Sequence, residues 1–512
     1  MSFTPTYPGV YVTELPSGVH PISGVSTSTA AFVGMAARGP VNVPQVLTSW
    51  GDYQRIFGGL WSGSTMSYAV FQFFQSGGTL AIAVRVTGAN AAAATIDLQD
   101  NVLLDATNAG AWGNKLAARV DYNTSDPSDA TLWNLTVRDL ATGTTEKYLN
   151  ISTDATSARS LANSLARSAL VRPDSNASQT TRPQESTKPP AGTDPWSATT
   201  YYAPGENGKD GDTISGNDII GSSTAPHTGI NALLDTTVIF NILCVPAPDP
   251  SKDLDSAALT AAAELCVAHR AMLIVDPPVA WATVGDALSG MSSPPVTGDA
   301  AANAAMYFPR FIAEDPVTAQ QATYSVTGAI AGIWASTDSR LGVWKAPAGI
   351  ETALSASSLA VTMTDPENGE LNPLGLNCLR TFPVIGNVVW GARTLQGADV
   401  LASQWKYIPV RRLALYIEES LRRGTQWVVF EPNAEPLWAS IRLNVGAFMQ
   451  NLYRRGAFAG ATPDAAYLVK CDAENNPRDQ VNLGIVNILV GFQPLEPAEF
   501  VLISIEQLAG QA

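Results

Sequence analysis

One strand–helix–strand pattern between residues 237 and 278 constrains the fold more than any other part of the sequence. TVIFNILCVP (237–246) and AMLIVDPP (271–278) have the aliphatic and β-branched composition of buried strands. LTAAAELCVAHR (259–270), which lies between them, repeats its apolar residues at helical spacing. The three segments predict a βαβ unit, and therefore an α/β layer in the core of the protein.

A similar alternation precedes this unit near the N-terminus. Residues 25–34 are predicted to form a strand, residues 50–59 and 66–75 to form helices, and LAIAVRV (80–86) to form a second buried strand. The expected fold class is therefore α/β, in a mixed α+β arrangement.

The C-terminal third contains the clearest helical patterns. Residues 410–423 and 437–452 each place their large apolar side chains on one face. Strands are predicted for the segment between these helices and for three later segments, the last of them unusually apolar for a chain end: 425–432, 466–472, 483–494 and 499–508.

The region between these two parts has a different composition. Residues 115–150 are predicted to form a β-hairpin with a Thr-Gly turn at 142–143. Residues 173–227 are rich in Ser, Thr, Pro, Gly and Asn and show no sustained apolar period, which predicts a long surface loop.

Charge and cysteine content narrow the classes of function. Only 15% of the 512 residues are charged, against about 25% in average globular proteins, which indicates that much surface is buried against other chains. The net charge of -15 argues against general nucleic-acid binding.

The four cysteines are scattered, so we expect reduced thiols rather than a zinc site or disulfides. Neither a leader peptide nor an 18-residue apolar run is present, so we expect no membrane insertion.

No catalytic constellation emerges from the sequence, and we expect no catalytic, cofactor-binding or metal-binding residues. The histidines (His20, His227 and His269) lie far apart and match no metal or catalytic motif. Asp210, Asp212 and Asp218 faintly resemble a calcium-binding repeat, although a solvated turn is favoured. Asp276 ends a strand, where α/β enzymes often place catalytic groups, but a simple turn is favoured there too.

Basic residues concentrate between Trp405 and Arg455. This window has eight Lys/Arg and four Asp/Glu, a local excess of four positive charges in an acidic chain. These cations either complement helix dipoles or form a face for an acidic partner, and we weigh the two equally. The candidates for such a face are Arg422, Arg423, Arg442, Arg454 and Arg455.

Several segments in a fixed order resemble the tail sheath proteins of contractile-tailed phages and related contractile injection systems. The resemblance rests on YPGVYVTELPSG (7–18), SWGDYQRIFGG (49–59), TGINALLDTTVIFNILCVP (228–246), WKYIPVRRLALYIEESLRRGTQWVVFEPN (405–433) and PAEFVLISIEQ (497–507). It fails across about 91–227, and no family detail is transferred there.

The resemblance implies a nested, multi-domain structural subunit and no enzyme. An N-terminal arm (1–24) and an inner domain (375–512) would enclose a middle domain formed by 25–90 and 236–374, with 91–235 inserted on the outside. The implied partners are copies of the same chain in a helical homopolymer, an inner tube protein, and baseplate and terminator or cap proteins. The implied setting is assembly in a bacterial cytoplasm, as part of a virion tail or an injection particle. Contraction of the polymer would drive the tube through a target cell envelope.

Both ends of the chain are candidates for linking subunits. Residues 7–15, with Val10, Tyr11 and Val12, and residues 499–508 have the extended character of strands, and an apolar edge left exposed would invite aggregation. We expect each arm to add a strand to a neighbour's sheet. The C-terminal residues concerned are Phe500, Val501, Leu502, Ile503 and Ile505. Two alternatives are a monomeric surface-binding module carried by residues 91–235 and an α/β enzyme of unknown class.

Overall fold

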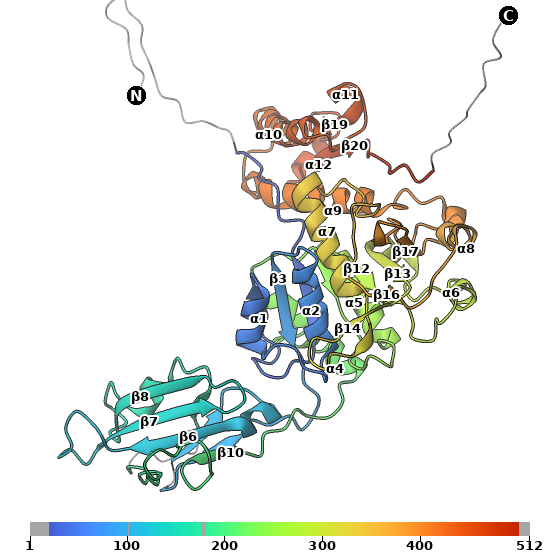
Figure 1. Cartoon of the computed structure of the whole chain (residues 1–512). Helices are drawn as coiled ribbons and strands as arrows, with labels where there is room; N and C mark the ends of the chain where they lie inside the picture. The colour runs from blue at the N-terminus through green and yellow to red at the C-terminus, as the bar shows by residue number, and fades with distance from the viewer. Residues whose placement is uncertain (1–19, 101, 176–180, 501–512) are drawn as a thin grey trace, which may run out of the picture. The chain divides into compact units, whose positions relative to one another are not determined.

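The computed structural model describes residues 20–100, 102–175 and 181–500 (Figure 1). The chain divides into two compact units. The main unit comprises Ser26–Arg411, and the terminal unit combines Met1–Val25 with Arg412–Ala512.

An eight-stranded sheet in the order β18-β17-β13-β12-β11-β1-β3-β2 forms the centre of the main unit. The six inner strands run parallel, and β2 and β18 close the two edges in antiparallel pairing. The bounds of the strands are β1 (Ala30–Gly34), β2 (Gln45–Leu47), β3 (Ala81–Arg85), β11 (Ile242–Cys244), β12 (Met272–Val275), β13 (Ala304–Phe308), β17 (Asn377–Phe382) and β18 (Gly386–Val389).

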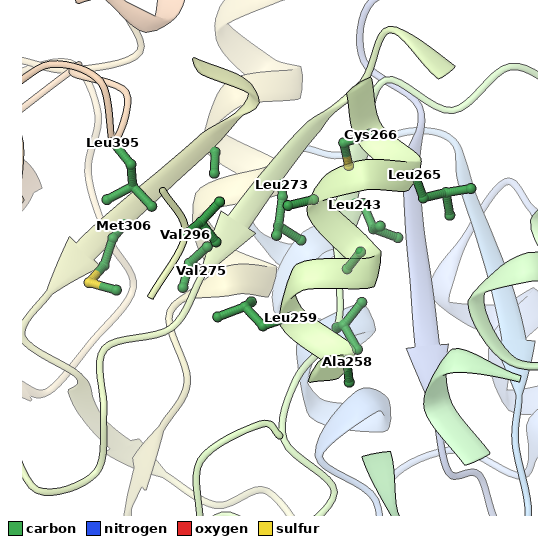
Figure 2. Packing of buried hydrophobic residues seen from close by; sticks show 14 of the residues in the cluster. Leu243, Ala258, Leu259, Leu265, Cys266, Leu273, Val275, Val296, Met306 and Leu395 are labelled. Atoms are coloured by element: carbon green, nitrogen blue, oxygen red, sulfur yellow. The ribbon is translucent and has the colours of Figure 1, made fainter. Parts of the chain in front are cut away.

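Helices cover both faces of this sheet, so its inner strands are buried on both sides. On one face, α5 (Ser256–His269) packs Leu259 and Cys266 near Leu243 and Leu273 of the strands (Figure 2). On the other face, the ring of Phe73 in α2 (Thr65–Gln75) meets the ring of Phe32 at 5.5 Å, edge to face. The predicted βαβ unit is confirmed as β11–α5–β12. All four cysteines are buried and free, as expected.

Two glycines allow α2 and α7 (Thr327–Leu341) to approach each other closely. A Cβ atom added at Gly328 would lie 2.2 Å from the carbonyl oxygen of Ala69, and one at Gly332 would lie 2.5 Å from that of Phe73. Both obstacles are backbone atoms of α2, which a side-chain rotation does not relieve. The four-residue spacing of the glycines therefore matches the four-residue spacing of their contacts on α2.

We expect Gly328→Ala to destabilise the main unit by about 1–3 kcal/mol, because the added methyl group must push the two helices apart. Urea denaturation measures the change in the free energy of unfolding. Gly369→Ala in α8 (Asp365–Leu371) is the matched control, since a Cβ atom there meets nothing within 4 Å. This control is expected to be neutral or to stabilise by up to about 1 kcal/mol. Equal effects of the two substitutions would contradict the close helix contact.

The inserted region contains a seven-stranded antiparallel sheet in the order β8-β7-β6-β10-β4-β5-β9. Its core includes Trp133, Leu135 and Ile151. Its strands are β4 (Thr95–Asp97), β5 (Leu103–Ala106), β6 (Leu116–Asp121), β7 (Leu132–Asp139), β8 (Thr145–Ser152), β9 (Val171–Pro173) and β10 (Ala203–Glu206). The hairpin expected within 115–150 is confirmed as part of β6–β7–β8.

Two boundaries differ from the sequence-based domain assignment. Ile214, Ile219 and Leu233 belong to the core of the eight-stranded sheet, so the separate sheet of the insertion ends well before residue 235. Residues 375–411 belong to the main unit rather than to the terminal one, because β17 pairs with β13. The compact terminal unit therefore begins at Arg412 instead of residue 375.

The terminal unit is largely helical and carries one small sheet. The helices expected at 410–423 and 437–452 are confirmed as α9 and α10, and the strands expected within 466–472 and 483–494 as β19 and β20. The expected strand at 425–432 is wrong: residues Gln426–Val428 form a 3-10 turn. The elements are α9 (Ile408–Gly424), α10 (Glu435–Arg454), α11 (Pro463–Ala466), β19 (Tyr467–Lys470), α12 (Arg478–Asn482) and β20 (Leu489–Phe492).

The remaining elements are short and belong to the main unit. A three-stranded antiparallel sheet has the order β15-β14-β16. The bounds are α1 (Trp50–Phe57), α3 (Leu161–Leu165), α4 (Gly216–Ile220), α6 (Val284–Gly290), β14 (Phe311–Glu314), β15 (Gln321–Tyr324) and β16 (Ser358–Leu359).

Candidate functional site

The N-terminal segment is anchored on the helices of the terminal unit. The ring of His20 stacks on Trp427 at 4.2 Å, and the His20 backbone amide donates to Asn444 Oδ1 at 2.9 Å. The Val25 amide donates to Ser420 Oγ at 3.1 Å. This stacking explains why the apolar segment after α9 is not a strand. The segment folds so that Trp427 covers His20, which lies far away in the sequence.

Both arms expected from the sequence therefore leave from the terminal unit. Phe500, the last described residue, is 77% exposed. The other arm candidates (Val10, Tyr11, Val12, Val501, Leu502, Ile503 and Ile505) lie outside the described residues, so their pairing as strands stays a prediction.

The β19–β20 sheet has the features of an acceptor for additional strands. Tyr467 pairs with Phe492 and Lys470 with Leu489 in antiparallel register. Within the described ranges, each strand has only the other as a ladder partner, so both outer edges of this two-stranded sheet are open. An isolated pair of this kind is marginally stable in water and gains from further strands.

The two faces of this sheet are unequal. On one face, Phe458 contacts the rings of Tyr467 and Phe492 at 6.1 and 5.6 Å. The Tyr467 hydroxyl lies 2.7 Å from Gln450 Oε1 of α10, which fixes the sheet on that helix. On the other face, Leu468 and Leu489 are each 52% exposed. The fixed face sets the position of the sheet, and the exposed face offers apolar surface to an incoming chain.

Further exposed apolar side chains occur in the same unit. Phe430 is fully exposed and has a positive φ of 72°, which is unusual for a bulky residue. The others are Val429, Leu443, Leu483, Ile485 and Leu495. Exposed apolar surface in this amount is typical of a protein–protein contact. The exposure of Phe430 is not predictable from the sequence, because VVF (428–430) has the composition of a strand.

Three of the five candidate arginines are held by carboxylates of the terminal unit itself. Arg422 and Arg423 both donate to Glu419, at 2.6–2.8 Å. Hydrogen bonds from Arg422, then from Arg423, lower the pKa of the buried Glu419 carboxyl to about 2, against the opposing effect of burial. Arg442 donates to Glu435 at 2.6 Å and to the carbonyl of Cys471. The structure thus uses these three cations internally.

The other two candidates, Arg454 and Arg455, lie exposed at the C-terminal end of α10. Arg454 has no ion pair within the described parts of the chain. Cations at this end complement the helix dipole. Among the five candidates, Arg454 is therefore the cation that no described carboxylate pairs with.

We expect Glu419→Gln to destabilise the terminal unit by about 1–3 kcal/mol at pH 7, because the three hydrogen bonds from Arg422 and Arg423 lose their anionic acceptor. The folded-state pKa of Glu419 lies below its usual value of 4.5, so its contribution is present above about pH 4.5 and is lost as pH falls towards 2. Denaturant midpoints measured from pH 7 to pH 3 should therefore converge for the two proteins.

Glu431→Gln is the matched control for this prediction. Glu431 is exposed and forms no ion pair with any described residue, so its substitution should change stability by less than about 0.5 kcal/mol. A Glu419→Gln effect that does not depend on pH would contradict the assigned ion pairs.

The aspartates considered above as catalytic or calcium-binding residues form hydrogen bonds within the fold. Asp276 accepts from the Ser325 hydroxyl at 2.6 Å and from the Val326 amide at 3.0 Å, and so caps the start of α7. Asp210, Asp212 and Asp218 accept from Ala111, Asn90 and Ser215 respectively.

The histidines also have separate partners in different parts of the chain. His227 lies 2.7 Å from Asp235, and His269 stacks on Phe240. In the described ranges, no three His, Cys, Asp or Glu side chains are grouped to hold a metal ion. No described helix is long and apolar enough to cross a membrane.

Comparison of the sequence with known proteins identifies similarities over parts of the chain. Residues 402–507 match the family model of the phage tail sheath C-terminal domain. The chain is 26% identical over 290 residues to a Pseudomonas aeruginosa prophage protein described as a major tail sheath protein, covering 54% of this chain and 68% of that protein. It is 25% identical over 181 residues to the tail sheath protein of Vibrio phage KVP40, covering 35% of this chain but only 26% of the phage protein.

A likeness in fold extends further than these sequence matches. The helical sheath of the anti-feeding prophage, solved in its contracted state, aligns with 98% of this chain and 100% of its own, with a TM-score of 0.59 and 21% identity. The match includes the mixed α/β architecture of several sheets and helices. The segment matched by the family model, 402–507, includes α9, α10 and the β19–β20 sheet of the terminal unit.

Proposed function

This chain belongs to the tail sheath protein family, and on that premise we propose that it is the structural subunit of a contractile sheath. Copies of the chain polymerise helically around an inner tube and then contract, which drives the tube through a target cell envelope. The observation that carries this proposal is the match of the terminal unit to the sheath C-terminal domain, together with a likeness in fold that spans the chain.

We propose that strand addition links the subunits. The arms 7–15 and 499–508 of neighbouring copies add to the open edges of β19–β20, so that backbone hydrogen bonds connect each subunit to the next. Three observations support this: among the described strands none pairs with the outer edges of β19–β20, the exposed face of that sheet carries Leu468 and Leu489, and both arms belong to the same unit. Links of this kind survive a change of lattice pitch, because the chain segments before them can bend.

The domain roles follow from the same proposal. The terminal unit faces the tube, with Arg454 and Arg455 as the cationic contacts, and the seven-stranded sheet of the insertion lies on the outer surface. The further partners are baseplate and terminator or cap proteins, and assembly takes place in a bacterial cytoplasm. In this proposal the protein acts as a polymer, and Asp276, the strand-end carboxylate considered for catalysis, caps α7.

Deletion of the gene in its native bacterial host tests this function. Particles from the deletion strain should be bare tubes without an outer sheath, and the full chain supplied in trans should restore sheathed particles that shorten on triggering. Intact contractile particles in the deletion strain would overturn the proposal.

A further inference from the structure

The eight-stranded sheet has a crevice where open α/β sheets generally bind small molecules. From β1 the chain proceeds to β3 on one side, and from β11 it proceeds to β12 and β13 on the other. The direction of winding therefore reverses between β1 and β11, and ligands bind outside the carboxyl ends of the strands at such a switch point. The start of α2 crosses these strand ends, where Thr65 Oγ1 donates to the Ala247 carbonyl at 2.6 Å.

A cavity of about 150 Å³ lies at this place in the main unit. Its lining includes Tyr68 and Ala69 of α2, Pro246 after β11, and Tyr324 at the end of β15. The rings of Tyr68 and Tyr324 lie 5.4 Å apart and form one aromatic wall. A cavity of this volume is large enough for a molecule the size of benzene.

The three charged side chains that line the cavity differ in their hydrogen-bond and ion-pair partners. Asp276 caps α7, as described above. Arg310 donates twice to the Pro277 carbonyl and lies 4.0 Å from Asp253. Asp315 is 9% exposed and accepts only from neutral donors, the Tyr68 hydroxyl at 3.2 Å and the Val317 amide at 2.8 Å. Asp315 is therefore a buried carboxylate without a cationic partner in the described structure.

Tyr324 adds a second unused polar group. Its hydroxyl oxygen is buried and has no hydrogen-bond partner in the described structure. Burial, followed by the charge of Asp315, raises the pKa of both tyrosines, to about 12 for Tyr68. Both hydroxyls are therefore protonated at neutral pH. A buried acceptor, an unpaired hydroxyl and two aromatic rings together match one ligand chemistry, because an ammonium group satisfies carboxylate, hydroxyl and ring faces at once.

We propose that this cavity binds a protonated primary amine on a short apolar stem, with the ammonium group at Asp315 and the stem against Tyr68, Tyr324 and Pro246. The source of the amine is either a free small molecule or the lysine side chain of a second copy of the chain. The binding of the amine itself does not depend on the proposed sheath function.

Calorimetric titration of the unassembled full-length chain with n-butylamine at pH 7 tests the proposal. We expect saturable binding at one site, and no binding of n-butanol or butyrate at the same concentrations, since neither supplies a cation. Asp315→Asn should weaken amine binding at least about tenfold. Asp253→Asn is the matched control, because its carboxylate lies outside the cavity lining, and it should leave the affinity unchanged.

Tyr324→Phe provides a second variant that removes a single oxygen atom, and it should weaken binding about threefold or more. Circular dichroism establishes that each variant is folded. Absence of saturable amine binding, equal binding of n-butanol, or full affinity in folded Asp315→Asn would each overturn the proposal. Repeating the titration on assembled material separates the sources: a free small amine still binds there, whereas a lysine from a second copy occupies the cavity on assembly and excludes n-butylamine.

Discussion

Deletion of residues 497–512 is expected to leave a soluble, folded subunit that no longer forms tubes. The deleted segment contains the apolar residues 499–508, predicted from the sequence to form a strand, which we propose to pair with an edge of a neighbour's β19–β20 sheet. About five backbone hydrogen bonds at about 1 kcal/mol each would be lost per contact, which weakens association more than a thousandfold. Sedimentation followed by negative-stain microscopy measures the assembled fraction.

A shorter deletion provides the control for this experiment. Removing only residues 509–512 takes away four residues beyond the strand and should leave tube formation intact. Ile503→Pro, which removes one strand donor and fixes the backbone, should reproduce the defect of the long deletion. If the chain lacking 497–512 still polymerises and contracts, strand donation by this arm is wrong.

The double reversal Arg454→Glu/Arg455→Glu is expected to prevent assembly around an inner tube while the purified chain still polymerises by itself. Both side chains are exposed at the end of α10, where the interaction of a cation with the helix dipole contributes about 0.3–1 kcal/mol per residue. Attraction to an acidic tube would turn into repulsion. Co-assembly with purified inner tubes at several salt concentrations measures the effect, which should be largest at low ionic strength.

Arg159→Glu/Arg167→Glu is the matched control for charge. These two arginines are exposed in the region of the seven-stranded sheet, and their reversal makes the same change in net charge. Sheathed tubes should form normally with this variant. If the α10 variant also assembles on tubes, the terminal unit does not use these cations for tube contact.

The sequence predicts the elements whose buried side chains form a recognisable apolar pattern within the element itself. β11, α5 and β12 are apolar almost throughout, because strands covered by helices on both faces have no solvent side. α9 and α10 show one apolar face each, and both helices lie within two residues of their expected bounds at each end. The arginine excess of this region is likewise visible in the sequence.

The errors come from partners that lie far away in the chain. The segment 425–432 has strand composition, but Trp427 stacks on His20 and removes it from any ladder. β10 contains a proline and a glycine, which disfavour a strand, but it pairs with β4 and β6 in antiparallel register. The ion pairs of Arg422 and Arg423 with Glu419, three and four residues earlier on the same helix, are local, but the tube-facing role of these arginines stays a prediction.

Cryo-electron microscopy of the purified full-length chain, with no other component, tests whether the subunits polymerise by strand addition. We expect helical tubes or stacked rings in which the arms of each copy add strands to the β19–β20 sheet of a neighbour. A monodisperse monomer that persists at high protein concentration would contradict it.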